Sequence, residues 1–167
     1  MKFSYAPQGL PFLSITLSHH KRSISRTALV DSGSTINVLP YEDGLDLGLS
    51  WEEQSVPLRD EGFLLGAPMY GVLLTVQLES YSPVTQAFAW TQKSRNEVRL
   101  ILGQTNFFEY FEIRFRGREK TFEISPYEQA SIGDLFISLK SFRACILTVV
   151  RVSPSRISDA GGLFASI

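Results

Sequence analysis

One carboxylate stands where an apolar, strand-like run meets a loop of small residues. The run is Ala-Leu-Val at residues 28–30, the acid is Asp31, and Ser-Gly-Ser-Thr follows at residues 32–35. Three consecutive apolar residues predict a strand that is buried up to its end, and Gly33 lets the backbone turn tightly where another molecule approaches. An ordinary turn aspartate is the alternative, because Asp and Gly are common in turns. The chain then returns directly to an apolar run at residues 36–40, which favours an acid held between two strands.

A second apolar strand that ends in a glycine lies further along the chain. Leu-Ile-Leu occupies residues 100–102, Gly103 interrupts the run, and a turn or short helix is expected next. The order and separation of the Asp-Ser-Gly motif and this segment resemble the retropepsin family of aspartic peptidases. The resemblance extends over residues 10 to 126, and it implies that the two segments pack into a crossed structure called the ψ-loop.

The rest of the sequence predicts many short strands and little helix. Residues 72–78 alternate apolar and polar side chains, as a half-buried strand does. Strands at residues 56–66 and 69–78 are expected to form a hairpin around Gly66-Ala67-Pro68, and residues 41–49 predict a short helix or turns. Together with the resemblance, this pattern predicts an all-β, retropepsin-like half-barrel with a ψ-loop, one short helix and an active site completed in a homodimer.

Length and composition fit one domain with an appendage. The chain has 167 residues, and 44% of them are apolar, which is enough to supply a core. We expect a retropepsin-like domain at residues 1–126. A C-terminal extension of unknown role is expected at residues 127–167, partly disordered at its end. Within it, residues 146–150 either add a strand at a dimer interface or belong to a loosely held tail.

Charge and cysteine usage argue against several other classes of protein. The net charge is −1, so no overall field attracts nucleic acid or an acidic membrane surface. One cysteine, Cys145, cannot form an intramolecular disulfide, and the spacings of a zinc site are absent. The first residues lack a signal-peptide core, and no apolar run approaches the ~20 residues that span a bilayer. We therefore expect a cytoplasmic protein with no membrane span and no nucleic-acid partner.

The resemblance implies a mechanism that needs two chains. Peptide hydrolysis of this kind uses two carboxylates that share a proton, one activating water and the other bonding to the scissile carbonyl. Asp-Ser-Gly occurs once here, so Asp31 of each copy is expected to meet at the two-fold axis of a homodimer. Like charges in contact do not both ionise cheaply, so the pair should titrate in two steps and favour acid to neutral pH. The expected protein is an aspartic endopeptidase that cleaves an extended polypeptide without a metal or organic cofactor.

The resemblance also implies roles by motif position. Asp31 is the expected acid and base, Ser32 is expected to hydrogen-bond across the dimer, and Gly33 is expected to give the substrate a close approach. The predicted hairpin occupies the position of the flap, which closes over substrate and excludes water. Its Pro68 removes a backbone donor, unlike glycine-rich flap tips. The residues expected to bind substrate are Ser34, Gly66, Ala67 and Met69.

Other polar clusters are expected on solvated surfaces. His19 and His20 are adjacent in a basic turn with no third ligand, so a metal site is not expected there. Four acids fit no calcium-loop spacing and are expected to form a wet face; they are Asp43, Asp46, Glu52 and Glu53. Three arginines alternate along one predicted strand and are expected on its solvated face, with an anionic partner as the alternative; they are Arg114, Arg116 and Arg118.

Two other functions remain open from the sequence. A non-catalytic peptide-binding or dimerisation module could keep the same fold, because a fold and a motif do not guarantee turnover. A regulatory domain that binds through the arginine-rich strand would associate in a strongly salt-dependent way and would be indifferent to Asp31.

Overall fold

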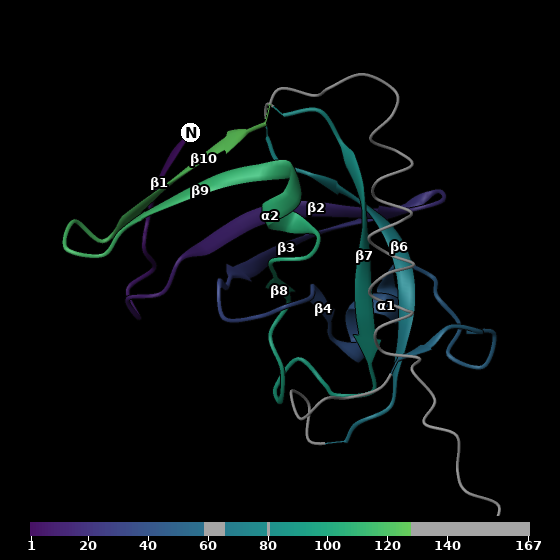
Figure 1. Ribbon diagram of the computed structural model, residues 1–167. Coiled ribbons are helices and arrows are strands. Elements are labelled where there is room, and N and C mark those ends of the chain that lie inside the picture. Colours follow the sequence, from purple (N-terminus) through teal and green to yellow (C-terminus); the bar gives the residue numbers. More distant parts are fainter. Residues whose placement is uncertain (59–65, 80, 128–167) are drawn as a thin grey trace, which may run out of the picture.

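The computed structural model describes residues 1–58, 66–79 and 81–127 (Figure 1). Within these residues the chain is mostly β, which confirms the predicted all-β class. The described residues contain two short helices where one was expected, because the segment predicted as a helix or turns forms a helix. The elements in chain order are β1 (Lys2–Ser4), β2 (Phe12–His19), β3 (Arg22–Val30), β4 (Val38–Leu39), α1 (Tyr41–Asp46), β5 (Pro57–Leu58), β6 (Met69–Gln77), β7 (Val84–Thr91), β8 (Ile101–Leu102), α2 (Phe107–Tyr110), β9 (Phe111–Arg116) and β10 (Thr121–Pro126).

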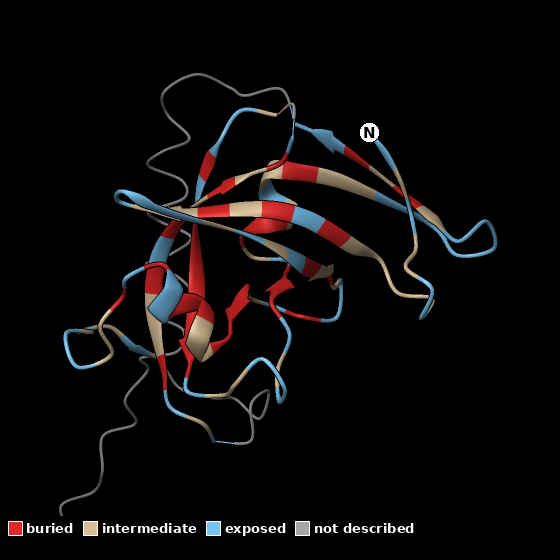
Figure 2. Ribbon diagram, turned by 180° about the vertical axis from the view of Figure 1, so that it is seen from behind, coloured by how far each residue is buried: buried red, intermediate tan, exposed pale blue. Residues whose placement is uncertain are grey.

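The larger sheet closes on itself. Its strand order is β2-β3-β8-β4-β7-β6-β5, and β2 also pairs with β6. Successive side chains of a strand point to opposite faces, and on β2 the inward ones are Leu13, Ile15 and Leu17, each at most 3% exposed. Burial of this kind runs along the other long strands as well, as the red segments in Figure 2 show. The closed sheet therefore surrounds an apolar core.

Strand β8 lies between two strands that are consecutive in the chain. It pairs in parallel with β3, where Leu29 lies opposite Ile101, and antiparallel with β4, where Val38 lies opposite the same residue. Because β3 and β4 are joined by residues 31–37, β8 enters the sheet between the two ends of one loop. This is the predicted ψ-loop, and it places Asp31 where β8 and β3 end together.

A smaller sheet has the order β1-β10-β9. β9 and β10 form a hairpin, with Phe115 opposite Phe122. Phe122 is fully buried and stacks on Phe3, with 5.3 Å between the ring centroids. Aromatic packing thus joins the first strand of the chain to the last described one. The exposed arginines of β9 pair with acids, Arg114 with Glu112 and Arg116 with Glu123.

Helix α1 is fixed by a cluster of charges, and the expectation of a wet face was wrong for one of them. Asp43 is 2% exposed and accepts hydrogen bonds from Nε of Arg26 (2.6 Å) and Nε of Arg95 (2.8 Å). The same two guanidinium groups also pair with Asp46. Burial lowers the pKa of Arg95, but its hydrogen bonds to Asp46 and Asp43 outweigh that effect, and the pKa is raised. A buried carboxylate with two cationic partners therefore joins α1 to β3.

The predicted C-terminal extension falls on residues that the structure does not describe. The C-terminal extension, including the apolar run at residues 146–150, lies almost wholly in residues 128–167, so the domain boundary stays a prediction. Within residues 1–58, 66–79 and 81–127, no helix is long and apolar enough to cross a membrane.

Gly44 sets how closely α1 packs on β7. A Cβ at this position would overlap the indole ring of Trp90 and lie 2.7 Å from its Cζ2. Trp90 is fully buried, and its Nε1 donates to the carbonyl oxygen of Tyr41 (3.0 Å), so the ring cannot move aside. We expect Gly44→Ala to lower the free energy of unfolding by ~1–3 kcal/mol, although alanine is the better helix former. Chemical denaturation measures this change.

Gly117→Ala is the matched control. A Cβ at Gly117 would meet nothing within 4 Å, and its effect should stay within about 0.5 kcal/mol. Equal stability of the two variants would contradict the close packing of α1 on Trp90.

Candidate active site

Asp31 lies at the end of β3 and is held by its own loop. Its backbone N–H donates to the carbonyl oxygen of Leu102 (3.0 Å), and its carbonyl oxygen accepts from Ser34 N–H (3.2 Å). The N–H of Gly33 donates to Oδ1 of the carboxylate (2.8 Å). Asp31 is half-buried, and Ser32 and Gly33 are exposed. The loop therefore orients one carboxylate against buried strands while keeping it accessible from outside.

The two serines of the loop lie in different surroundings. Ser32 is exposed, and its carbonyl oxygen accepts a hydrogen bond from Nε2 of Gln104. Ser34 is fully buried, and its hydroxyl donates to the carbonyl oxygen of Ile36 (2.7 Å). Ser34 thus supports the loop from within, and the substrate contact expected of it stays a prediction.

Residues 103–105 lie directly against the far side of the loop. Gln104 N–H donates to the carbonyl oxygen of Ser34 (2.9 Å), and Thr105 N–H donates to that of Thr35 (2.8 Å). A Cβ on Gly103 would overlap the carbonyl group of Ile36 and lie 2.9 Å from the carbonyl oxygen of Ser34. The glycine at the end of the apolar strand is therefore required by the close approach of two backbones.

A group of buried amides beneath the loop was not predicted from the sequence. Oδ1 of Asn37 accepts from Gly103 N–H (2.8 Å), while its Nδ2 donates to Oε1 of Gln86 (3.0 Å) and to the carbonyl oxygen of Ala87 (3.1 Å). The N–H of Ala87 donates to Oδ1 of Asn106 (3.2 Å). The sequence signal was an isolated amide inside an apolar run, as Asn37 is between Ile and Val, but exposed strand positions give the same signal.

An apolar cluster lies beside the loop. Strands β4, β6, β7 and β8 contribute Val38, Met69, Ala89 and Ile101, all buried, and Ala67 is among the partly buried residues that pack on them. This cluster, which we call the apolar shelf, brings Ala67 and Met69 next to β4, which follows the Asp31 loop, and β8, which pairs with both β3 and β4. Met69 also pairs with Leu58 across the base of the predicted hairpin, which confirms the β5–β6 pairing.

Gly66 lies next to residues 59–65, which are outside the described part of the chain. Its φ is +79°, a conformation that favours glycine, and it is exposed. The tip of the predicted flap therefore stays a prediction, whereas its base is formed by β5 and β6.

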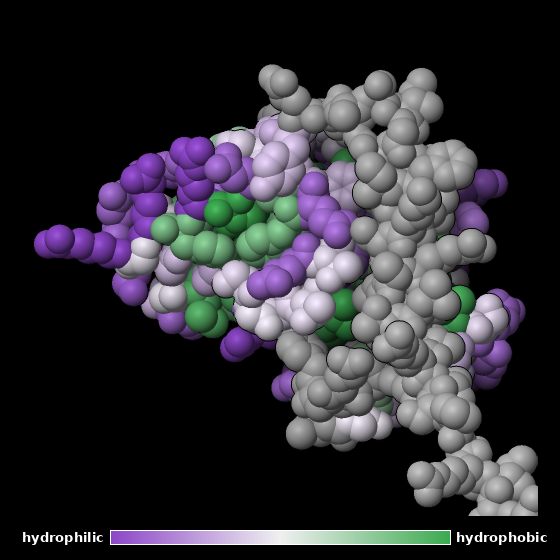
Figure 3. Space-filling model, in the orientation of Figure 1, coloured by the Kyte–Doolittle hydropathy of each residue, from purple (hydrophilic) through white to green (hydrophobic). Residues whose placement is uncertain are grey.

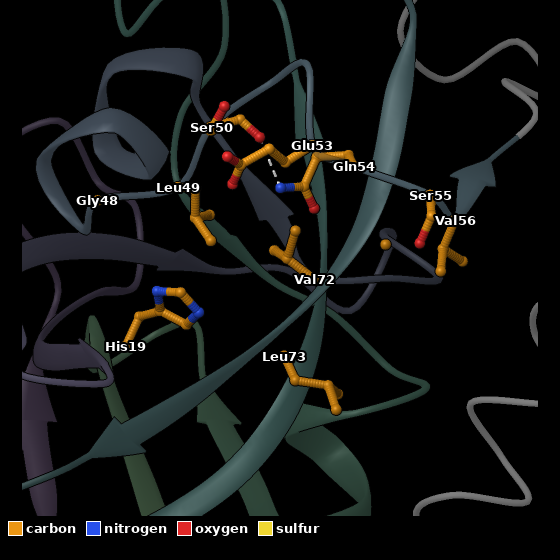
Figure 4. A pocket seen from close by; sticks show the side chains of 11 residues that line it. His19, Gly48, Leu49, Ser50, Glu53, Gln54, Ser55, Val56, Val72 and Leu73 are labelled. Carbon is orange, nitrogen blue, oxygen red and sulfur yellow. Dashed lines mark hydrogen bonds between the residues drawn. The ribbon is translucent and has the colours of Figure 1, made fainter.

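A cavity of about 390 Å³ is separate from the loop (Figure 4). Its lining comes from the end of β2, the segment after α1, and β6, and includes His19, Glu53 and Leu73, but not Asp31. His19 Nδ1 lies 3.4 Å from the carbonyl oxygen of Leu47. In the described residues, no group of three or more His, Cys, Asp or Glu side chains is placed to hold a metal ion.

Gly103→Ala tests the docking of the loop. The atoms that would be overlapped belong to the backbone and cannot rotate away, so the segment and the loop should separate. We expect the free energy of unfolding to fall by ~1–3 kcal/mol or more, and the amide hydrogens of Gln104 and Thr105 to exchange faster. Denaturation and hydrogen exchange measure the two effects. Unchanged exchange at both amides would show that the loop does not need this close approach.

Comparison with known proteins supports the fold. No family model matches the sequence, and neither does any curated protein. Among solved structures, the chain is similar to a retropepsin-like aspartic protease from Rickettsia conorii, with a TM-score of 0.57 and 16% sequence identity over 76% of this chain and 89% of that one. The resemblance carried by the two motifs is thus confirmed at the level of the fold. The chain has the retropepsin-like fold, with Asp31 at the crossing of its ψ-loop.

Proposed function

We propose that this protein is an aspartic endopeptidase in which Asp31 from two copies forms the catalytic pair. The observation that carries the proposal is the placement of Asp31, half-buried at the end of β3 and bonded through its backbone to Leu102 of the crossing strand. The same fold occurs in a retropepsin-like aspartic protease. Residues 1–126 are the unit to which we assign this function.

The proposed chemistry needs two acids that share one proton. One carboxylate removes a proton from water, and the protonated partner donates a hydrogen bond to the scissile carbonyl. The hydrogen bond from Gly33 N–H to Oδ1 of Asp31 fixes the orientation of the carboxylate before substrate arrives. Preorganisation of this kind avoids rearrangement during the reaction.

A homodimer supplies the second acid in this proposal. Ser32 and Gly33 are exposed in one copy, as groups that meet a second copy must be. An apolar area is also present on β9, where Phe115 is 38% exposed and Ile113 is partly buried. Figure 3 shows apolar side chains gathered over the face that carries β9. A two-fold contact between identical loops places like residues opposite one another.

The substrate we propose is an extended polypeptide. Ala67 and Met69 belong to the apolar shelf beside the loop, so apolar side chains of a substrate are the ones that this surface would accept. Gly66 completes the set of proposed substrate-binding residues together with Ser34, whose fully buried hydroxyl supports the loop beneath that surface. The single cysteine fits a reducing compartment such as the cytoplasm.

Asp31→Asn tests the catalytic role. The amide keeps the size of the side chain but cannot act as the base, so cleavage of a peptide library should fall by ~10²–10⁴-fold or below detection. Mass spectrometry of the products measures cleavage, and sedimentation checks that the dimer persists. Glu119→Gln, which changes an exposed acid in the β9–β10 turn, should leave cleavage unchanged. Equal cleavage by wild type and Asp31→Asn would overturn the proposal, and peptide binding without hydrolysis in both would identify a non-catalytic module.

Dilution tests the need for two chains. If each site takes one acid from each copy, activity should fall with the square of protein concentration once dimers dissociate. Initial rates over a dilution series, compared with the dissociation measured by sedimentation, give this dependence. Constant specific activity at concentrations where the protein is monomeric would contradict a shared site.

A further inference from the structure

Asn37 is a polar residue in a buried position beneath the Asp31 loop. The residue is fully buried, and its amide bonds to three partners: Gly103 N–H just after β8, and Oε1 of Gln86 and the carbonyl oxygen of Ala87 on β7. A buried amide costs free energy unless it is hydrogen-bonded, so these contacts are specific rather than incidental. Asn37 is also the last residue of the Asp31 loop before β4 begins.

The amide of Asn37 continues the contact with β7 on the N-terminal side of β4. β4 pairs with β7 only at Val38 and Leu39, and the carbonyl oxygen of Asn37 accepts the N–H of Ala89 (2.9 Å). Beyond that point Nδ2 of Asn37 takes the place of a strand partner and bonds to Ala87. The side chain therefore anchors the loop to β7 at a place where the pairing of β4 with β7 has ended.

The other end of the same amide reaches the segment that docks on the Asp31 loop. Oδ1 accepts a hydrogen bond from Gly103 N–H. The residues on either side of Gly103, Leu102 and Gln104, both bond to the loop. On one side, the carbonyl oxygen of Leu102 accepts Asp31 N–H; on the other, Gln104 N–H donates to Ser34. A shift of Gly103 would therefore move both contacts together.

We propose that Asn37 is a positioning residue that fixes the Asp31 loop, and through it the carboxylate, relative to β7 and β8. The inference rests on the proposed function for its catalytic consequence. In a symmetric dimer both loops shift in the same way, so the two displacements add in the separation of the two Asp31 carboxylates. Misplacement of reacting groups by about 1 Å can cost 10²-fold in rate.

Gln86 provides the matched control. It is also fully buried, and it shares the network through Oε1, which accepts from Asn37. Its Nε2 has no hydrogen-bond partner among the described residues. Gln86 therefore bonds through its side chain to Asn37, whereas Asn37 bonds directly to Gly103, which lies against the Asp31 loop. Gln86→Leu disturbs the same core without removing the link to the loop.

The first experiment needs no peptidase activity. Amide hydrogen exchange is compared in wild type, Asn37→Leu and Gln86→Leu, with the amides of β2 and β3 as the reference for overall stability. We expect the amide hydrogens of Gln104 and Thr105 to exchange about tenfold faster or more in Asn37→Leu, relative to that reference. In Gln86→Leu they should follow the reference. Equal changes in the two variants would overturn the proposal.

The second experiment measures the pH profile of cleavage. If the carboxylate pair is misplaced, Asn37→Leu should lower kcat about tenfold or more with a smaller effect on KM, and it should displace the limbs of the profile, because they report the coupling of the pair. Gln86→Leu should keep the wild-type profile. An unchanged profile in Asn37→Leu would overturn the catalytic part of the proposal.

Two outcomes would prevent these comparisons, and each has an alternative measurement. If Asn37→Leu does not fold, Asn37→Ser replaces it, because the hydroxyl keeps a polar group at this buried position but is too short to bond to all three partners. Faster exchange than in wild type supports the proposal, and a wild-type rate overturns it. If wild type cleaves no peptide, the proposed function fails. The exchange experiment then still decides whether Asn37 holds the loop.

Discussion

The docking of residues 101–105 into the Asp31 loop is the constraint on which the site depends. Asp31 N–H bonds to Leu102, and Gln104 N–H bonds back to Ser34, so the loop is held on both sides of one short segment. Each of these backbone groups would cost about 1–3 kcal/mol if it were buried without a partner. The two segments are far apart in the sequence, and the closed sheet brings them together.

The rest of the fold supports this contact from behind. The ring of strands supplies a core in which the inward side chains of β2 and β6 are buried, and the pair of arginines around Asp43 holds α1 against β3. On the other side of the loop, the apolar shelf joins β4 and β8 to the base of the β5–β6 hairpin. Rigid support on one side and an accessible carboxylate on the other are what a hydrolytic site requires.

Residues that belong to short sequence motifs could be assigned a place from the sequence. Residues whose role depends on contacts with distant segments could not. Asp31 and Gly103 belong to short motifs, and the ψ-loop was expected because those motifs resemble the retropepsin family. Asn37 gave only an ambiguous signal, because its role depends on contacts with Gly103 and Gln86, which are distant in the sequence and close only in the fold. Asp43 was expected to be exposed for the same reason: an acid in a short helix is usually solvated, and two arginines from other segments made its burial possible. A second copy, and therefore the pairing of acids, lies beyond what one chain specifies.

The most direct test of the account is the distance between the two Asp31 carboxylates in a crystal structure of the protein, obtained alongside sedimentation at the same concentration range. We predict a two-fold dimer in which carboxylate oxygens from the two copies lie within about 2.5–3.5 Å, close enough to share a proton. A monomer, or a dimer in which Asp31 faces no second carboxylate, would contradict the account.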